Sequence, residues 1–235
     1  MMLKLKMVFA ISLVFVTQVL IGQTTKEAFE KVNKTFASAT NISYNIKYLY
    51  YANNTDKQPV ETMTGAYKRI GDSYYSRIET KELVVNEKYR LVIDNETQHL
   101  IIENRQRVSF KQDEQMGVNL DSALSLCSKI TSRNEQGKQV YSMFFSDEIP
   151  IYTQIDVSID SKTNFIQKIS IFFKGESERE TPRLDVELSA YNTNPQISKD
   201  FFSEKKYVSI DSGGNVTLNI NYRLFKLLSP KVSTQ

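Results

Sequence analysis

The clearest pattern in this sequence is a series of short runs, between residues 41 and 110, in which apolar and polar residues alternate. The first run places large side chains at every second position: Ile42, Tyr44, Ile46, Tyr48 and Tyr50. Successive side chains of a strand point to opposite faces, so this run predicts a strand with one buried and one solvent face. Turns are expected at Gly71-Asp72, Asn86-Glu87 and Asp94-Asn95, which gives an antiparallel meander.

Two segments have the period of an amphipathic helix instead. The first runs from Thr24 to Ala37, with Thr24 and Glu27 as a capping box and an apolar stripe of Ala28, Phe29, Val32 and Phe36. The second begins near Asn119 and is expected to run for about twelve residues, because apolar residues recur at helical spacing. These residues are Leu120, Ala123, Leu124, Cys127 and Ile130. An exit loop is expected from Ser132 to Lys138.

Strand patterns then return for most of the remaining chain. The expected strands are Val140–Phe145, Ile155–Ile159, Phe165–Phe173, Leu184–Ala190, Tyr207–Ile210 and Val216–Tyr222. Two helices are too few to cover both faces of a sheet of about eleven strands. We therefore expect a mainly β fold with two helices (α+β). It would be a strongly curved, unclosed antiparallel sheet, a half-barrel, with the helices packed on its concave face.

The first 22 residues are expected to lie outside this fold. Lys4 and Lys6 precede an uncharged apolar run from Met7 to Ile21, which is typical of a secretory signal peptide. An uncleaved membrane anchor is the alternative, although the run is short for a membrane span. We predict a signal peptide at 1–22, a single domain at 23–235 and export, most simply to the periplasm.

Charge and cysteine content restrict the partners and the chemistry. Removing residues 1–22 lowers the formal net charge from +3 to +1, and no Lys/Arg cluster remains, which argues against nucleic acid as a partner. Cys127 is the only cysteine, so no intrachain disulfide can form. A small buried side chain is the simplest interpretation of Cys127, since its neighbours do not favour a reactive thiolate.

The sequence offers no convincing catalytic, metal or cofactor site. His99 is the only histidine, and a nucleophile and an orienting acid would have to be brought to it. One histidine and one cysteine do not make a usual zinc ligand set. The acid pairs Glu178/Glu180 and Asp185/Glu187 fit a charged loop and a solvated strand face, and Gly213-Gly214 fits a hairpin turn. We predict a protein that is not an enzyme and needs no cofactor.

The order of these elements resembles the LolA/LolB-like superfamily of periplasmic lipoprotein carriers, over roughly residues 24 to 210. The features that carry the likeness are the signal sequence, the first helix, Gly65 with Tyr67, Lys68 and Arg69, the Tyr74-Tyr75 strand, the mid-chain helix and Asp200-Phe201-Phe202. The resemblance implies helices that form a lid over a hydrophobic cavity for acyl chains, and places the family's lid-associated arginine at Arg69. The chain departs from the family at Asn86-Glu87, in lacking tryptophan, and in the strand after Gly214.

A cavity of this kind predicts a set of lining side chains on the apolar faces. The candidates are Tyr44, Tyr48, Tyr67, Arg69, Tyr74, Tyr89, Leu120, Leu124, Ile155, Ile169 and Phe173. The alternative for the tyrosines, isoleucines and Phe173 is a filled core, and for Arg69 a position at the rim of the sheet. Leu120 and Leu124 would hold the second helix on the sheet in either case.

Two functions are consistent with these patterns. The first is a monomeric, non-enzymatic carrier or binding protein of the cell envelope for a lipid, lipoprotein or other apolar ligand. The second is a structural or interaction protein with a filled core that docks an envelope protein partner, through exposed strand edges near Val216 to Tyr222.

Overall fold

The structure is a computed structural model that describes residues 25–105, 120–175 and 181–233. The first part contains a helix at 25–38 and six strands: β1 (Asn41–Tyr51), β2 (Glu61–Ile70), β3 (Ser73–Ile78), β4 (Lys81–Val85), β5 (Tyr89–Asp94) and β6 (His99–Asn104). The predicted signal peptide and Thr24 lie outside the described residues. No helix within the described ranges is long and apolar enough to cross a membrane.

The remaining elements include one short helix, α3 (Leu120–Leu126), and three 3-10 turns, η1 (Lys199–Phe202), η2 (Glu204–Lys206) and η3 (Ile220–Tyr222). The strands are β7 (Cys127–Glu135), β8 (Lys138–Phe145), β9 (Tyr152–Asp160), β10 (Ile166–Phe173), β11 (Arg183–Asn192), β12 (Val208–Ile210), β13 (Val216–Leu218) and β14 (Lys226–Leu227).

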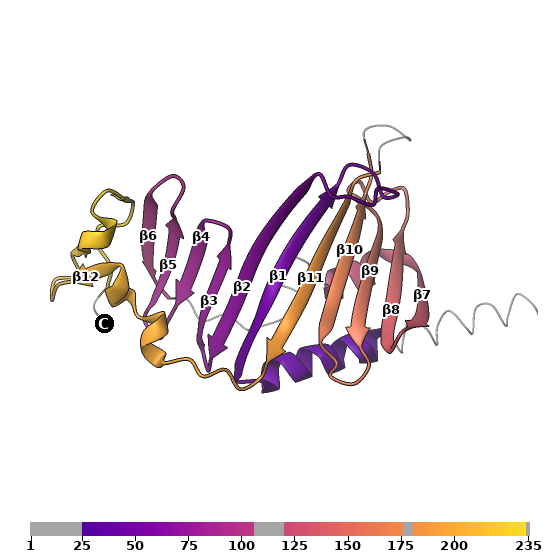
Figure 1. Cartoon of the computed structure of the whole chain (residues 1–235), viewed down its shortest axis with the longest axis horizontal. Helices are drawn as coiled ribbons and strands as arrows, with labels where there is room; N and C mark the ends of the chain where they lie inside the picture. Colours follow the sequence, from indigo (N-terminus) through magenta and orange to yellow (C-terminus); the bar gives the residue numbers. More distant parts are fainter. Residues whose placement is uncertain (1–24, 106–119, 176–180, 234–235) are drawn as a thin grey trace, which may run out of the picture. The chain divides into compact units, whose positions relative to one another are not determined.

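Twelve strands form one hydrogen-bonded sheet in the order β14-β6-β5-β4-β3-β2-β1-β11-β10-β9-β8-β7, while β12 and β13 pair separately (Figure 1). The neighbouring strands whose register is resolved are antiparallel, except for the parallel β14–β6 pair. The predicted class, a mainly β protein with an unclosed antiparallel sheet and two helices, is confirmed. The described residues divide into two compact units, which we describe separately: unit 1 comprises residues 25–38, 48–62, 120–175 and 181–187, and unit 2 comprises residues 39–47, 63–105 and 188–233.

In unit 1 both helices lie on β8. The predicted stripe of the first helix is confirmed, since Phe29, Val32 and Phe36 are buried and the Phe29 ring meets Tyr141 of β8 edge-on at 5.7 Å. Residues directly opposite each other on paired strands share a face, and Tyr141 begins a buried row with Val157, Ile169 and Val186. α3 also contacts β8. This face is the core of unit 1.

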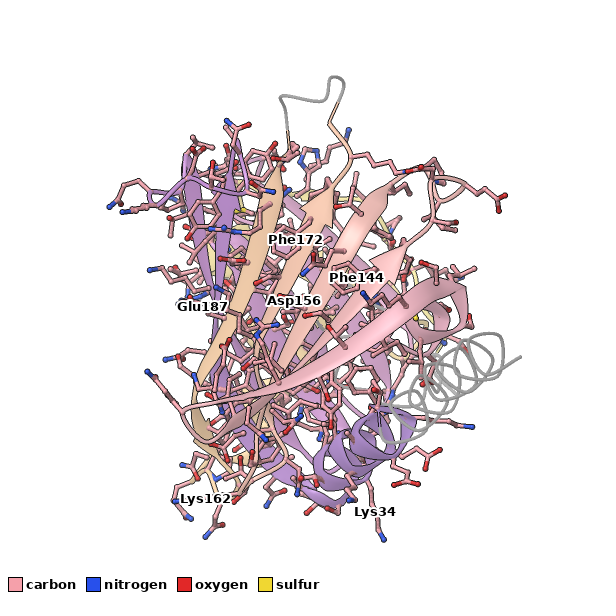
Figure 2. The ribbon with its side chains drawn as sticks, turned by 90° about the vertical axis from the view of Figure 1, so that its right-hand side faces the viewer. Lys34, Phe144, Asp156, Lys162, Phe172 and Glu187 are labelled. Atoms are coloured by element: carbon pink, nitrogen blue, oxygen red, sulfur yellow. The ribbon has the colours of Figure 1, made fainter. Side chains whose placement is uncertain are left out.

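The other face of β7–β11 is polar but closely paired. Its middle row includes Asp185, which is 1% exposed and lies 2.8 Å from the Lys168 ammonium and 3.3 Å from the Arg183 guanidinium. The sticks of Figure 2 show the side chains of this part of the sheet around the labelled Asp156. Asp156 accepts a 2.6 Å hydrogen bond from Gln154. The predicted alternation of apolar and polar faces is therefore present here, but the expectation that Asp185 lies on a solvated face is wrong, because Lys168 and Arg183 cover its carboxylate. The other acid pair, Glu178/Glu180, lies outside the described residues.

In unit 2 the buried face changes from one strand to the next. On β5 and β6 the buried residues are Tyr89, Leu91, Ile93, Leu100 and Ile102. They pack against side chains that follow β11 in the chain: Phe202, Tyr207, Val208, Val216 and Val232. Tyr74 pairs with Val85, and Val85 pairs with Arg90, so the Tyr74 side chain is on the face opposite to Tyr89. β5 and β6 each alternate as predicted, but their buried side is opposite to the side of β3 that carries Tyr74.

Three predicted elements differ from the structure. The second helix ends at Leu126 after seven residues, and Cys127 and Ile130 lie in β7, where pairing with β8 begins at Cys127–Phe145. The expected loop at 132–138 is the end of β7 and a tight turn at Gln136 and Gly137, both with positive φ. The expected strand to Tyr222 ends at Leu218 and continues as η3, and β14 was not predicted.

The buried positions of β1 also change along the strand. Ile42, Tyr44 and Ile46 are buried as predicted, but Leu49 and Tyr51 are buried in place of Tyr48 and Tyr50. The alternation therefore shifts by one residue between Ile46 and Leu49. Such a shift cannot be seen in a sequence where both sets of positions are apolar.

Candidate functional site

The most distinctive group of side chains in unit 2 is a row of four tyrosines contributed by neighbouring strands. Tyr191 of β11 lies 5.1 Å from Tyr44 of β1, which stacks on Tyr67 of β2 at 5.0 Å, and Tyr67 lies 6.1 Å from Tyr74 of β3. Tyr44, Tyr67 and Tyr74 are 2%, 1% and 6% exposed. We call these four residues the tyrosine row.

Strand register explains how the row forms. Tyr67 is directly opposite Ser76 and Tyr74 is directly opposite Arg69, so Tyr67 and Tyr74 are diagonal neighbours on one face. Diagonal positions are about 7–8 Å apart, which aromatic rings can bridge. The row therefore follows from placing tyrosine at inward positions of adjacent strands.

Arginine side chains lie beside the row. Arg69 is 2% exposed and donates a hydrogen bond of 2.5 Å from Nη2 to the carbonyl oxygen of Ala39. Burial raises the pKa of Tyr74, and the positive charges of Arg90 and Arg105 oppose that rise. Burial likewise raises the pKa of Tyr67, with Arg69 opposing it. By register, Arg69 is directly opposite Tyr74, and Arg90 follows on the same face across Val85, where Glu103 pairs with it at 2.9 Å.

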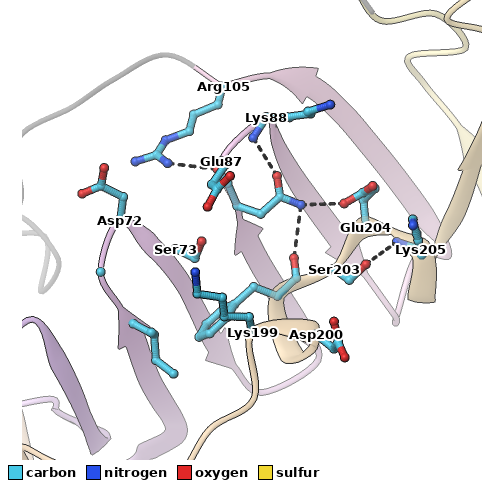
Figure 3. A pocket seen from close by; sticks show the side chains of 14 residues that line it. Asp72, Ser73, Glu87, Lys88, Arg105, Lys199, Asp200, Ser203, Glu204 and Lys205 are labelled. Carbon is cyan, nitrogen blue, oxygen red and sulfur yellow. Dashed lines mark hydrogen bonds between the residues drawn. The ribbon is translucent and has the colours of Figure 1, made fainter.

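Arg105 also lines an open polar pocket at the turns of unit 2, with a volume of about 1060 Å³ (Figure 3). Its lining has four cationic and four acidic side chains: Lys88, Arg105, Lys199, Lys205, Asp72, Glu87, Asp200 and Glu204. The lining is too polar to hold an acyl chain.

Asn86 organises the pocket. Its side-chain amide donates to Glu204 at 2.7 Å and to the Phe202 carbonyl at 3.3 Å, while its side-chain oxygen accepts from the backbone N–H of Lys88 at 2.9 Å. Arg105 donates to the Asn86 carbonyl at 3.0 Å. The turn predicted at Asn86-Glu87 thus connects β4–β5 to η1 and η2, and sequence reasoning missed this role because the partners are far apart in the chain.

The structure brings some of the predicted lining residues together. Tyr44, Tyr67, Arg69 and Tyr74 gather at the tyrosine row, and Arg69 is buried within β2 instead of at a rim. Tyr89 does not join them, since it is part of the core on the opposite face. The sequence did not single out Tyr191, Arg90 or Arg105.

The other predicted residues belong to unit 1. Ile155 and Ile169 are buried on the face that carries Tyr141, and Leu120 is buried in α3. Leu124, Tyr48 and Phe173 are half-buried, with the Phe173 ring 6.0 Å from Tyr152. These side chains belong to, or border, the core of this unit.

The residues with possible chemistry have ordinary surroundings. The Nδ1 atom of His99 lies 2.9 Å from the Thr97 hydroxyl, and burial raises the pKa of the half-buried Cys127 thiol, which disfavours the thiolate. Across the part of the chain that the structure describes, no group of three or more His, Cys, Asp and Glu could hold a metal ion.

Fold and site define an α+β protein whose unclosed antiparallel sheet carries a buried aromatic row with arginines beside it. No known family profile matches the chain, and no curated protein does. Solved structures do match it, and they include LolA superfamily protein NE2245 from Nitrosomonas europaea, with 8% identity, 75% of this chain and 98% of that chain covered, and a TM-score of 0.34.

Two further matches have a similar extent. An uncharacterized conserved protein from Thermus thermophilus has 8% identity, covers 76% of this chain and 92% of its own, and has a TM-score of 0.47. LprF from Mycobacterium bovis has 13% identity, coverage of 74% and 96%, and a TM-score of 0.34. The chain is thus similar in fold to these solved structures at low sequence identity, and we argue function from the residues of this chain.

Proposed function

We propose that this protein is a non-enzymatic binding protein or carrier of the bacterial cell envelope for an amphiphile with an acyl chain. The observation that carries the proposal is the tyrosine row, with Arg69 directly opposite Tyr74 on the neighbouring strand. The acyl chain would lie along the row, and Arg105 would attract an anionic head group, since Arg90 is already paired with Glu103 at 2.9 Å and the buried Arg69 donates to the Ala39 carbonyl. A lipid and the lipid-modified end of a lipoprotein share this chemistry.

Dimensions and energy are compatible with this assignment. Four neighbouring strands span about 15 Å, a length on the scale of an acyl chain. Each methylene removed from water contributes about 0.8 kcal/mol, so about ten methylenes would contribute about 8 kcal/mol before the costs of association. This gross gain equals the free energy of micromolar binding, and the cost of association makes the net affinity weaker than that.

Ligand entry requires movement. Because Tyr44 and Tyr67 are almost completely buried, a ligand reaches them only when neighbouring segments are displaced. Location in the envelope follows from the predicted signal peptide. We propose a monomer that binds in the periplasm.

The test compares two tyrosines of similar burial on opposite faces of the sheet. Tyr67→Gln puts an amide into the tyrosine row, whereas Tyr89→Gln puts the same group into the core that includes Phe202 and Tyr207. With the fluorescent fatty acid cis-parinaric acid as the probe, we expect Tyr67→Gln to weaken binding by at least about tenfold relative to Tyr89→Gln. Equal binding by both folded variants, or no binding by the wild type, would refute the proposed site.

The second candidate is a structural or interaction protein with a filled core. The close contacts and low exposure of Tyr44 and Tyr67 favour it, since a well-packed aromatic cluster needs no ligand. It predicts that delipidated and untreated protein have the same melting temperature, and that a defined envelope protein is captured without lipid.

A further inference from the structure

We propose that the C-terminal segment 219–228 is a docking surface for an anionic lipid bilayer. The segment exposes three large aliphatic side chains: Ile220 is 70% exposed, Leu224 is 74% and Leu228 is 46%. Large aliphatic residues at this exposure are unusual when several occur within one short segment. The inference does not depend on the ligand proposed above.

These side chains are held outward by a fixed backbone. Lys226 N–H donates to the Gln98 carbonyl at 2.7 Å, Leu228 N–H to the Leu100 carbonyl at 2.9 Å, and Asn219 N–H to the Tyr207 carbonyl at 2.9 Å. β14 also pairs with β6. The segment is therefore attached to β6 at one end and to Tyr207, after η2, at the other, and the exposed residues are part of the folded unit.

The same segment divides its apolar residues between two sides. Tyr222, Phe225 and Leu227 pack against the core of unit 2, with the Tyr222 ring 5.1 Å from Tyr207 and 5.0 Å from Phe225. Ile220, Leu224 and Leu228 are the residues that remain outside. The inward residues already anchor the segment, so folding does not account for the outward ones.

The charge of the segment identifies the partner. Residues 219–228 contain two cations, Arg223 and Lys226, and no acid, and a third cation, Lys231, follows three residues later. All three cations are exposed and alternate in sequence with the outward aliphatic residues. Cationic side chains can remain at head-group level while adjacent aliphatic side chains enter the acyl boundary, which is the arrangement found in interfacial membrane anchors.

Acids also lie near this segment. The turn before β6 carries Asp94 and Glu96, and the hydrogen bonds that Asp94 accepts from the backbone N–H groups of Thr97 and Glu96 lower its pKa and keep it ionised, so these two acids reduce the positive charge of the three cations without outnumbering them. An acidic protein partner would satisfy the cations but not the exposed aliphatic residues. An anionic bilayer satisfies both kinds of side chain.

Flotation with phosphatidylcholine vesicles, with and without phosphatidylglycerol, tests the proposal. We expect wild-type protein to float with the anionic vesicles at low ionic strength and to be released by salt. The Ile220→Gln/Leu224→Gln variant should lower the partition coefficient by at least about tenfold, and neutralising Arg223, Lys226 and Lys231 to Gln should lower it on the order of a hundredfold.

The matched control replaces two exposed aliphatic residues of unit 1, Val60→Gln and Ile151→Gln, and should float as wild type does. Because all of these side chains are exposed, each variant should keep the wild-type melting temperature. Absence of flotation by the wild type, an equal loss in the control, or self-association that disappears in Ile220→Gln/Leu224→Gln would overturn the proposal. Tyr67→Gln should float normally, which separates this test from that of the amphiphile site.

Discussion

At the scale of single residues, Tyr67 shows what burial does to the chemistry of the row. Burial raises the pKa of Tyr67 above its usual range, an effect that Arg69 opposes and Tyr74 increases. The unfolded chain ionises this tyrosine near pH 10, while the folded chain keeps it neutral. Since the unfolded state then binds fewer protons, stability is complete below pH 10 and falls as pH rises above it.

Tyr67→Phe removes this ionisable group. We expect the variant to lose stability less steeply than wild type above pH 10, by up to about 1.4 kcal/mol per pH unit. Urea unfolding at a series of pH values measures the difference, with Tyr50→Phe as a control at an exposed ring. Parallel alkaline profiles for wild type and Tyr67→Phe would mean that Tyr67 already ionises freely in the folded state.

Residue identities alone predicted part of the site. Tyr44, Tyr67, Arg69 and Tyr74 were found because strict alternation places them on one face of β1–β3. Tyr89 was placed on the wrong face because strand parity cannot be carried across a turn without the register. Arg105 acts on Tyr74 from the end of β6, and only the pairing of four strands brings the two together.

At the scale of elements, Gly65 shows how tightly β2 and β3 are paired. A Cβ atom at Gly65 would lie 2.4 Å from the carbonyl oxygen of Arg77, which is backbone and cannot move aside. Gly65→Ala should therefore cost about 3 kcal/mol or more in the free energy of unfolding.

Gly71→Ala provides the comparison. Gly71 has φ of +54° at the β2–β3 turn and nothing within 4 Å of an added Cβ, so its cost should be about 1 kcal/mol from backbone strain alone. Denaturant unfolding of both variants measures the difference. Similar losses for the two would show that β2 and β3 are less closely paired than the structure indicates.

Elements with a long, consistent pattern were predicted well, and short or ambiguous ones were not. The helix at 25–38 and most strands of the large sheet match their expected positions within a few residues. Leu120 to Ile130 satisfied a helical spacing, but pairing of Cys127–Glu135 with β8 supplies hydrogen bonds that the isolated pattern does not contain. β14 is two residues long and exists because β6 offers it an edge.

At the scale of the whole molecule, the fold class followed from counting one-sided strands against two helices. The sequence could not indicate that residues between Phe202 and Val232 pack on β5 and β6. Because of this packing, the buried face of those two strands is opposite to the face of β3 that carries Tyr74. Nor could it indicate which alternating residues form a core and which could receive a ligand, since both need the same apolar pattern. That distinction is a matter of binding and has to be measured.

Native mass spectrometry of the mature protein, purified from the envelope without detergent extraction, tests the central claim most directly. The account predicts an additional mass corresponding to one acyl-chain amphiphile, lost on organic extraction and restored on incubation with lipid, with Tyr67→Gln retaining much less of it than Tyr89→Gln. A bare polypeptide mass before and after incubation with lipid would contradict the account and leave the tyrosine row as a structural core.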